Sequence, residues 1–242
     1  MVEVRRFADL DALSRAAADD FIALGKAAIA ARGVFHVLLS GGSTPKRLFS
    51  LLADRGPTAL AWDKVELWWG DERSVAPTDA DSNYRMTREA LIEPLQLDER
   101  RVHRIAGELE PTKAAADYQR ALVAALGQPP VSDLALQGMG PDGHTASLFP
   151  HSPALDDTTH WVVANPVDSP VAKGKTTRIT LTARAINATR AVRFLVAGGD
   201  KAPALHAVLE GPRDGKAFPA QLIDNATWLV DEAAASKLGT TR

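Results

Sequence analysis

The sequence contains no cysteine among its 242 residues. This absence excludes disulfide bonds, thiolate metal sites and a cysteine nucleophile. The chain also lacks an apolar run long enough to cross a bilayer. Its formal net charge is only −2, so no basic field would attract nucleic acid or an anionic membrane. We therefore expect neither nucleic acid nor a membrane among its partners.

The N-terminal segment, MVEVRRFADLDALSRAAADDF, contains acidic residues and no apolar core of signal-peptide length. With 45% hydrophobic and 24% charged residues, the chain is able to bury a sizeable core. No repeat, low-complexity tract or clear linker divides it. We expect a single domain over residues 1–242, with room for a small lobe, in a cytoplasmic protein that is a monomer or a weak homo-oligomer.

Apolar segments of strand length alternate with helix-like segments along the chain. Strands are predicted over residues 34–39, 65–69, 102–105, 131–137, 161–164, 178–181 and 192–197. Helices are predicted over 11–32, 46–54, 81–92, 111–126 and a last segment that ends near 210–211. Pro94 is expected to end the third helix. This alternation predicts an α/β fold with a mostly parallel, doubly wound, Rossmann-like sheet and helices on both faces.

The segment 134–150, LALQGMGPDGHTASLFP, holds the strongest functional signal. Its apolar run ends in a glycine-rich turn that presents Asp142 and His144, and a short helix is expected to follow. Open α/β proteins bind ligands where strands end at the carboxyl edge of the sheet. Histidine has the unperturbed pKa closest to neutrality, so it can take up and return a proton there. We predict that His144 is a general base.

The sequence gives less support to other functions for this segment. Residues 138–143 match the dinucleotide pattern G-x-G-x-x-G, but they lie mid-chain and place Asp142 where a pyrophosphate would bind. Asp142 and His144 could instead be a helix cap and a structural histidine, although Gly143 between them favours a special backbone shape. The spacing to His151 indicates no metal site. The chain has no G-x-S-x-G motif, so it is not predicted to be a serine hydrolase.

A second loop, SGGSTP (40–45), lies between a predicted strand and a predicted helix. Its glycines let backbone N–H groups approach an anion, its hydroxyls add donors, and a helix N-terminus favours negative charge. The alternative is an N-capped helix after a tight turn. The loop has no Walker lysine, so a nucleoside triphosphate is not expected. The candidate phosphate-binding residues are Ser40, Gly41, Gly42, Ser43 and Thr44.

Charged residues follow two further predicted strands. Asp71 and Arg73 lie in GDER (70–73), and Lys201 follows Gly198 and Gly199. The charges of GDER at the carboxyl end of a strand suit the binding of a polar, hydroxylated ligand, and Asp71 is a candidate substrate-binding residue. The alternatives are a solvated turn with an internal ion pair for GDER and an exposed surface lysine for Lys201. A lysine at the start of a helix opposes the helix dipole, which an anionic ligand would explain. Because strand ends meet at one edge of a parallel sheet, we expect these loops to share one cleft.

Five segments together resemble the 6-phosphogluconolactonase family, which is related to the glucosamine-6-phosphate isomerases and deaminases. They are LSGGSTP (39–45), WWGDERSVAPTDADSNYRM (68–86), LALQGMGPDGHTASLFP (134–150), RITLT (178–182) and VAGGDKA (196–202). The third is the most specific, because the deaminases share D-G-H but differ after it. The resemblance implies hydrolysis of 6-phospho-D-glucono-1,5-lactone to 6-phospho-D-gluconate in the oxidative pentose phosphate pathway, without metal or organic cofactor.

By this resemblance, His144 corresponds to the family's base, with Asp142 beside it. The family's phosphate- and charge-binding positions correspond to the loop from Ser40 to Thr44, Arg73, Arg178 and Lys201. The chain departs from the family at VAKGKTTR (171–178), where relatives have a proline-rich stretch. Lys173 and Lys175 predict a more basic and more mobile loop there.

The expected mechanism is general-base activation of water by His144, with Asp142 orienting the imidazole. Arg73 or backbone N–H groups of the glycine-rich turn would stabilise the oxyanion. Two other functions would use the same loops. A sugar-phosphate isomerase or deaminase would use Asp71 as a base at carbon. A non-catalytic sugar-phosphate sensor would have no need for the Asp142–His144 pair.

Overall fold

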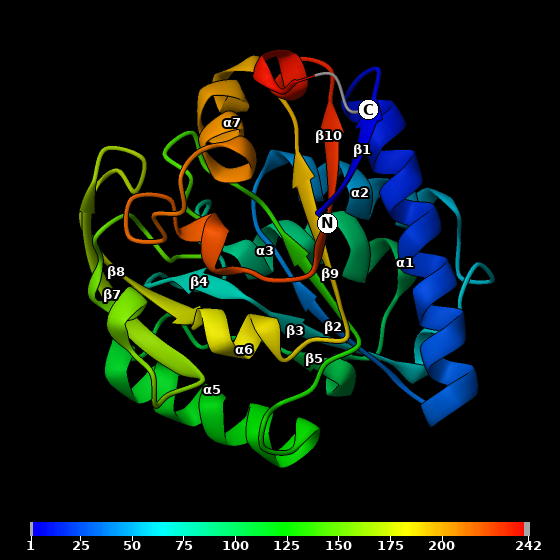
Figure 1. The fold of residues 1–242 in the computed structure, drawn as a ribbon. Coiled ribbons are helices and arrows are strands. Elements are labelled where there is room, and N and C mark those ends of the chain that lie inside the picture. Colours follow the sequence, from blue (N-terminus) through cyan, green and yellow to red (C-terminus); the bar gives the residue numbers. More distant parts are fainter. Residues whose placement is uncertain (1, 240–242) are drawn as a thin grey trace.

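The computed structural model describes residues 2–239, which form two β-sheets with helices packed around them (Figure 1). The strands are β1 (Glu3–Phe7), β2 (Phe35–Leu39), β3 (Val65–Trp69), β4 (Asp71–Arg73), β5 (Val102–His103), β6 (Leu134–Gln137), β7 (Val162–Ser169), β8 (Gly174–Leu181), β9 (Ala191–Val196) and β10 (Ala226–Asp231). The helices are α1 (Leu10–Arg32), α2 (Ser43–Asp54), α3 (Asn83–Thr87), α4 (Glu93–Leu95), α5 (Pro111–Leu126), α6 (Ala183–Asn187) and α7 (Ala202–Glu210).

The larger sheet is parallel throughout, with the strand order β1-β10-β9-β6-β2-β3-β5. Its central strands are short apolar runs, such as FHVLL in β2, because strands buried on both faces need no polar alternation. Trp68 and Trp69 of β3 are both buried, although successive side chains point to opposite faces. The predicted α/β fold with a mostly parallel, doubly wound sheet is confirmed.

Helix α1, at the right of Figure 1, shows how local sequence sets the limits of an element. The side chain of Asp9 accepts a hydrogen bond from the backbone at the start, and Gly33 ends the helix with a φ of 80°. Leu13, Ala17 and Phe21 form part of its buried face, as their helical spacing predicts. Within residues 2–239, no helix combines the length and apolar character that a membrane span requires.

The strand order reverses between β6 and β2. From β2 the sheet continues through β3 and β5, whereas β6 lies on the other side of β2 and continues through β9 and β10. At such a point the loops after neighbouring strands diverge, and α/β proteins bind ligands between them. The loops at residues 40–45 and 138–143 follow β2 and β6, so the two strongest motifs flank this point.

A second, antiparallel sheet with the order β4-β8-β7 was not predicted from the sequence. Residues 71–73, expected in a loop, form β4, and much of the expected loop 171–178 belongs to β8. The threonines of this segment are polar, so no apolar run indicates a strand there. Pairing with β7 nevertheless gives their backbone N–H and C=O groups hydrogen-bond partners. Gly70 links the sheets: its N–H donates to Leu39 O of β2 at 2.9 Å, and its carbonyl accepts from Leu181 N of β8 at 2.8 Å.

No helix follows His144, contrary to the prediction. Residues 145–150 turn back instead, with an isolated antiparallel bridge between Thr145 and Leu148. The cause is the side chain of Thr145, whose hydroxyl lies 2.8 Å from Gln137 Oε1 and 2.9 Å from the Gly138 carbonyl. These contacts hold the chain against the end of β6, so it does not extend into a helix.

Pro94 does not end the helix before it, as had been predicted. A π-helical turn over Arg88–Ile92 joins α3 to α4, and the helix continues to Leu95. The π-helical turn lies directly before Pro94, with the Glu93 N–H bonded to the Arg88 carbonyl, and such a local widening lets the helix continue past a residue that has no N–H to donate. Gln96, with a φ of 51°, ends the helix in the left-handed conformation.

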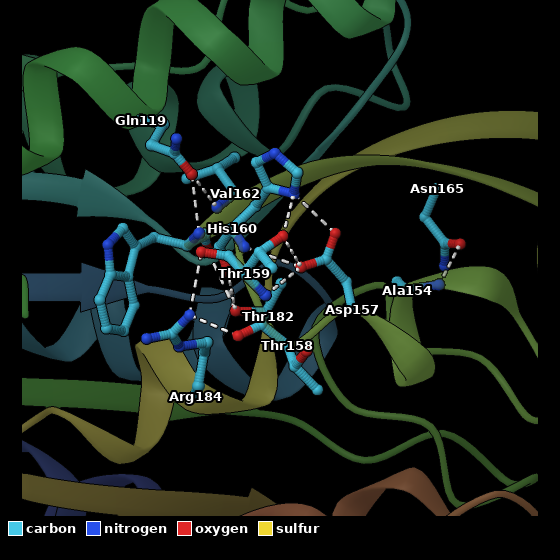
Figure 2. A network of polar contacts seen from close by, with 11 residues as sticks. Gln119, Ala154, Asp157, Thr158, Thr159, His160, Val162, Asn165, Thr182 and Arg184 are labelled. Atoms are coloured by element: carbon cyan, nitrogen blue, oxygen red, sulfur yellow. Dashed lines mark hydrogen bonds and ion pairs between the residues drawn. The ribbon is translucent and has the colours of Figure 1, made fainter.

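A polar network ties the start of β7 to two helices (Figure 2). Gln119 Oε1 of α5 accepts the backbone N–H of Trp161 at 2.7 Å and of the next residue at 3.1 Å. Arg184 of α6 donates to the carbonyl oxygens of Thr158 and Thr159 at 2.6 and 2.9 Å. The Arg184 guanidinium also lies 3.8 Å from the centre of the Trp161 ring. These contacts fix one edge of the small sheet.

Asp157 stabilises the turn before β7 (Figure 2). Its Oδ1 accepts the backbone N–H groups of Thr159 and His160 at 2.9 and 2.7 Å, and its Oδ2 lies 2.7 Å from His160 Nδ1. Burial opposes ionisation, but the hydrogen bonds from His160 and Thr159 outweigh it and lower the pKa of Asp157 to about 2.

Asp157→Ala should lower the free energy of unfolding at pH 7 by about 1–2 kcal/mol, because two backbone N–H groups lose their partner. The pKa is lowered in the folded state, so this stabilisation is present above the ordinary value of 3.8 and is lost as the pH falls toward 2. Urea unfolding at pH 7 and pH 3 should therefore show a smaller difference at pH 3. Asp156→Ala is the control and should change stability by less than about 0.5 kcal/mol. An equal difference at both pH values would contradict the expectation.

Candidate active site

A cavity of about 280 Å³ opens where the strand order reverses. Loops after β2, β6 and β9 line it from the larger sheet, and β4 and β8 line it from the small sheet. All but one of the site residues predicted from the sequence line this cavity: Ser40, Gly41, Gly42, Ser43, Thr44, Asp71, Arg73, His144, Arg178 and Lys201. The exception is Asp142, which contacts the ring of His144.

The Asp142–His144 pair has a fixed geometry. His144 Nδ1 lies 2.5 Å from Asp142 Oδ1, and the His144 backbone N–H donates to the same oxygen at 3.2 Å. The imidazole stacks on Phe149, with ring centres 4.3 Å apart. Burial disfavours the Asp142 charge, but the hydrogen bond and charge of His144 outweigh it and lower the pKa of Asp142. Within residues 2–239 no hydrogen bond occupies His144 Nε2, which leaves this nitrogen available to a ligand.

The glycine at position 140 is required by the close approach of this imidazole. A Cβ at Gly140 would lie 2.1 Å from His144 Cε1 and Nδ1. The Gly140 N–H donates to the His144 carbonyl at 2.9 Å, and the Gly140 carbonyl accepts from Gly143 N at 3.0 Å. The turn is therefore closed around His144. This packing explains the glycine at position 140, and the φ of 78° at Gly143 explains the glycine there.

The loop after β2 presents the N-terminus of helix α2 to the cavity. Gly42 has a φ of 103°, and the first turn, from Ser43, contains no acidic residue and no side-chain cap within the described residues. Backbone N–H groups at such a helix end have no intrahelical partner and favour an anion. Lys201, just before α7, also lines the cavity, and its ammonium pairs with Asp200 at 2.5 Å. These features suit an anionic ligand.

Two arginines of the small sheet line the cavity and are direct neighbours in its register, Arg73 in β4 and Arg178 in β8. Burial lowers the pKa of Arg178, and the adjacent Arg73 charge lowers it further. Arg178 Nη2 donates to the Ala172 carbonyl at 3.2 Å, but its buried Nε has no hydrogen-bond partner within residues 2–239. An anionic ligand would reduce the repulsion between the two guanidinium groups and could accept a hydrogen bond from Arg178 Nε.

Asp71 is buried in the same cavity, and side chains occupy both of its carboxylate oxygens. Ser147 Oγ donates to Oδ2 at 2.6 Å, and Asn83 Nδ2 donates to Oδ1 at 3.2 Å. Ser147 and Asn83 also line the cavity, but neither was predicted as a site residue. Both lie inside the family-like segments, yet they are 76 and 12 residues from Asp71. Only the fold shows that they share one carboxylate.

The segment 171–178 was expected to bring additional positive charge to the site. Lys173 pairs with Asp81 at 2.6 Å instead, and Lys175 lies 4.0 Å from Asp168. Within the described chain, neither lysine lines the cavity. Arg178 is therefore the cation that this segment presents to a ligand.

The cavity combines a histidine whose free nitrogen can take up a proton, a pair of arginines and an anion-binding helix terminus. This set suits the addition of water to a carbonyl group in an anionic substrate. No cluster of three or more His, Asp or Glu side chains in the described part of the chain is placed to hold a metal ion.

Comparisons with known proteins place the chain among enzymes of sugar-phosphate metabolism. The model of a family described as glucosamine-6-phosphate isomerases/6-phosphogluconolactonase matches residues 8–230. A 6-phosphogluconolactonase of Mycobacterium tuberculosis is 40% identical over 242 residues, covering 96% of each chain. A 6-phosphogluconolactonase of a Nostoc species is 39% identical over 220 residues, covering 87% of this chain and 88% of its own.

A solved structure of 6-phosphogluconolactonase from Trypanosoma cruzi is similar over 98% of this chain and 97% of its own, with a TM-score of 0.87 and 28% identity. The resemblance inferred from five motifs is therefore confirmed over most of the length of the chain. The protein belongs to the glucosamine-6-phosphate isomerase/6-phosphogluconolactonase family.

Proposed function

We propose that this protein hydrolyses 6-phospho-D-glucono-1,5-lactone to 6-phospho-D-gluconate in the oxidative pentose phosphate pathway. The observation that carries the proposal is one cavity that holds His144, the arginine pair and the N-terminus of α2. Relatives 39% and 40% identical over most of the chain are 6-phosphogluconolactonases. In the same proposal the chain acts in the cytoplasm as one domain, as a monomer or weak homo-oligomer, without cofactor, nucleic acid or membrane.

Hydrolysis of a lactone requires activation of water, stabilisation of the carbonyl oxygen and a proton for the departing ring oxygen. His144 Nε2 accepts a proton from water as the water oxygen attacks the lactone carbonyl carbon. The tetrahedral intermediate breaks its bond to the ring oxygen, and the imidazolium returns the proton to that oxygen. The acid that is formed ionises to the carboxylate. A positioned general base of this kind contributes roughly 10²–10⁴-fold to the rate.

Asp142 sets the tautomer of this base. Because Asp142 accepts the proton on His144 Nδ1, the lone pair of His144 lies on Nε2, the nitrogen left open to the ligand. The carboxylate also stabilises the imidazolium that forms during the reaction. The stacked ring of Phe149 limits rotation of the imidazole.

The remaining groups bind charge. Arg73 stabilises the oxyanion of the tetrahedral intermediate, and Arg178 adds a second positive charge beside it. The N-terminus of α2 and Lys201 bind the phosphate group of the substrate. Phosphate bound away from the carbonyl supplies energy that positions the lactone ring.

An isomerase or deaminase of the same family would need Asp71 as a base at carbon. Ser147 and Asn83 already donate hydrogen bonds to both Asp71 oxygens, which favours a binding role for this carboxylate. A sensor would bind the sugar phosphate without turnover, and it would have no use for a histidine oriented by Asp142.

A comparison of two reactions on one purified preparation, in buffer with EDTA, tests the proposed function. Acid release above the spontaneous rate follows lactone hydrolysis, and ammonia release follows deamination of glucosamine 6-phosphate. We expect hydrolysis and no ammonia. Ammonia release would contradict the proposal and identify the protein as a deaminase. Binding of 6-phosphogluconate in calorimetry, without turnover of the lactone, would contradict it and identify the protein as a sensor.

A further inference from the structure

Glu72 is a buried carboxylate that the proposed reaction does not use. It lies in β4 between Asp71 and Arg73, and its residue is only 2% exposed. Because successive side chains of a strand point to opposite sides, Glu72 points away from the side that carries Asp71 and Arg73. Glu72 is accordingly not among the residues that line the cavity, whereas both of its neighbours are.

The two oxygens of Glu72 accept four hydrogen bonds. Oε1 accepts the backbone N–H groups of Arg73 and Asn83, each at 2.8 Å. Oε2 accepts the backbone N–H of Tyr84 at 2.8 Å and the hydroxyl of Ser82 at 3.0 Å. The carboxylate thus joins β4 to the first residues of α3.

The segment that Glu72 holds supports three side chains of the cavity. Asn83 Nδ2 donates to the carbonyl of Asp71 at 3.0 Å and to its carboxylate at 3.2 Å. The guanidinium of Arg73 donates to the carbonyl of Asp81, the residue immediately before the clamped segment. A shift of residues 81–84 would therefore move the partners of both Asp71 and Arg73.

The carboxylate is costly to keep in this place. Burial raises the pKa of Glu72, although the backbone N–H groups that it accepts oppose the shift. An apolar side chain would avoid this desolvation but would leave the backbone N–H groups of Arg73, Asn83 and Tyr84 without this partner. The position is therefore occupied by a charged group with a full set of donors.

We propose that Glu72 is a positioning residue for lactone hydrolysis, which clamps residues 82–84 to β4 and so holds Arg73 and Asn83 in place at the cavity. This inference rests on the proposed function. Glu72 contacts no substrate atom and acts through Arg73 and through the Asn83–Asp71 pair.

Glu72→Gln is the first test, because it keeps the shape of the side chain but removes the charge and puts an amide nitrogen in place of one accepting oxygen. We expect kcat to fall about 10- to 100-fold, the scale that small displacements of catalytic groups produce, with KM changed less than about threefold. Asp133→Asn is the matched control, since Asp133 is also buried and accepts the backbone N–H of His36 at 2.9 Å. It lies just before β6, at the opposite end of that strand from the cavity, and should leave kcat unchanged.

A double-mutant cycle with Arg73→Ala separates positioning from general loss of structure. Because Glu72 acts in part through Arg73, Glu72→Gln should lower kcat by a smaller factor when Arg73 is already absent, and the loss that remains is the part carried by the Asn83–Asp71 pair. Losses in kcat that multiply in the double variant would overturn the inference, as would a folded Glu72→Gln enzyme with the kcat of the wild type. All variants are assayed below their melting temperatures.

A crystal structure of Glu72→Gln provides a readout that does not depend on activity. We expect residues 81–84 to shift and the contact of Arg73 with the Asp81 carbonyl to be lost. If the wild-type chain does not hydrolyse the lactone, the proposed function fails while this structural test still decides on the clamp. An unchanged segment 81–84 in the variant would end the clamp inference whatever the activity of the wild type.

Discussion

His144→Ala should lower kcat for lactone hydrolysis by at least about two orders of magnitude while KM changes little. The imidazole acts in the transition state, when its Nε2 takes the proton from water. In the ground state, the anion-binding groups of the cavity bind the substrate, and the substitution leaves them in place. Steady-state kinetics with the spontaneous hydrolysis rate subtracted measures both constants.

The chain offers a matched control for this variant. His160 is also paired with an aspartate, Asp157, at 2.7 Å, but its side chain is 57% exposed and it does not line the site cavity. His160→Ala should therefore retain the kcat of the wild type. Asp142→Asn should also lower kcat, but less than His144→Ala does, because the imidazole remains and only the carboxylate that orients it is lost. Turnover close to that of the wild type in a folded His144→Ala protein would falsify the general-base assignment.

The second large effect concerns the phosphate group of the substrate. Unphosphorylated glucono-1,5-lactone should be hydrolysed with a kcat/KM lower by a factor on the order of 10²–10⁴, because it loses two charge-assisted contacts of roughly 1.5–3 kcal/mol each. The groups concerned are the N-terminus of α2 at Ser43 and Thr44, and Lys201. Equal efficiency on the two lactones would refute a phosphate site.

Lys201→Ala tests one member of that site. It should reduce kcat/KM for the phosphorylated lactone only, so that the ratio between the two substrates shrinks. Lys175→Ala is the control, because the Lys175 side chain is 87% exposed and does not line the cavity. An unchanged ratio in Lys201→Ala would remove Lys201 from the site and leave the α2 terminus as the phosphate-binding group.

The location of the site could be predicted because it depends on local patterns. An apolar run followed by glycines and small polar residues indicates the carboxyl end of a buried strand, and such ends meet at one edge of a parallel sheet. This rule placed residues 40–45 and His144 beside one cavity without any knowledge of distant contacts. The strand between Val65 and Trp69 and the helix between Pro111 and Leu126 were predicted with their observed limits.

The groups that support the site could not be predicted, because each depends on contacts between distant segments. Glu72 lies in GDER (70–73), for which a solvated turn was one of the interpretations, yet its partners in residues 82–84 bury it almost completely. The Ser147–Asp71 contact joins residues 76 positions apart. Strand β1 was missed because two arginines interrupt its apolar pattern, and one of them, Arg5, pairs with Asp20 of α1 at 2.8 Å.

The junction at Gly70 has a consequence for how the two halves of the cavity can move. His144, the α2 terminus and Lys201 are carried by the larger sheet, whereas Asp71, Arg73 and Arg178 are carried by the small one. Gly70 joins the two sheets directly, with its N–H donating to Leu39 of β2 and its carbonyl accepting from Leu181 of β8, and the chain also crosses between the sheets after β4, β6 and β8. Arg73 and Arg178 are neighbours within the small sheet, so any displacement of that sheet would move the two arginines together relative to the imidazole. The width of the cavity is therefore set by the packing between the two sheets, which several chain connections hold together.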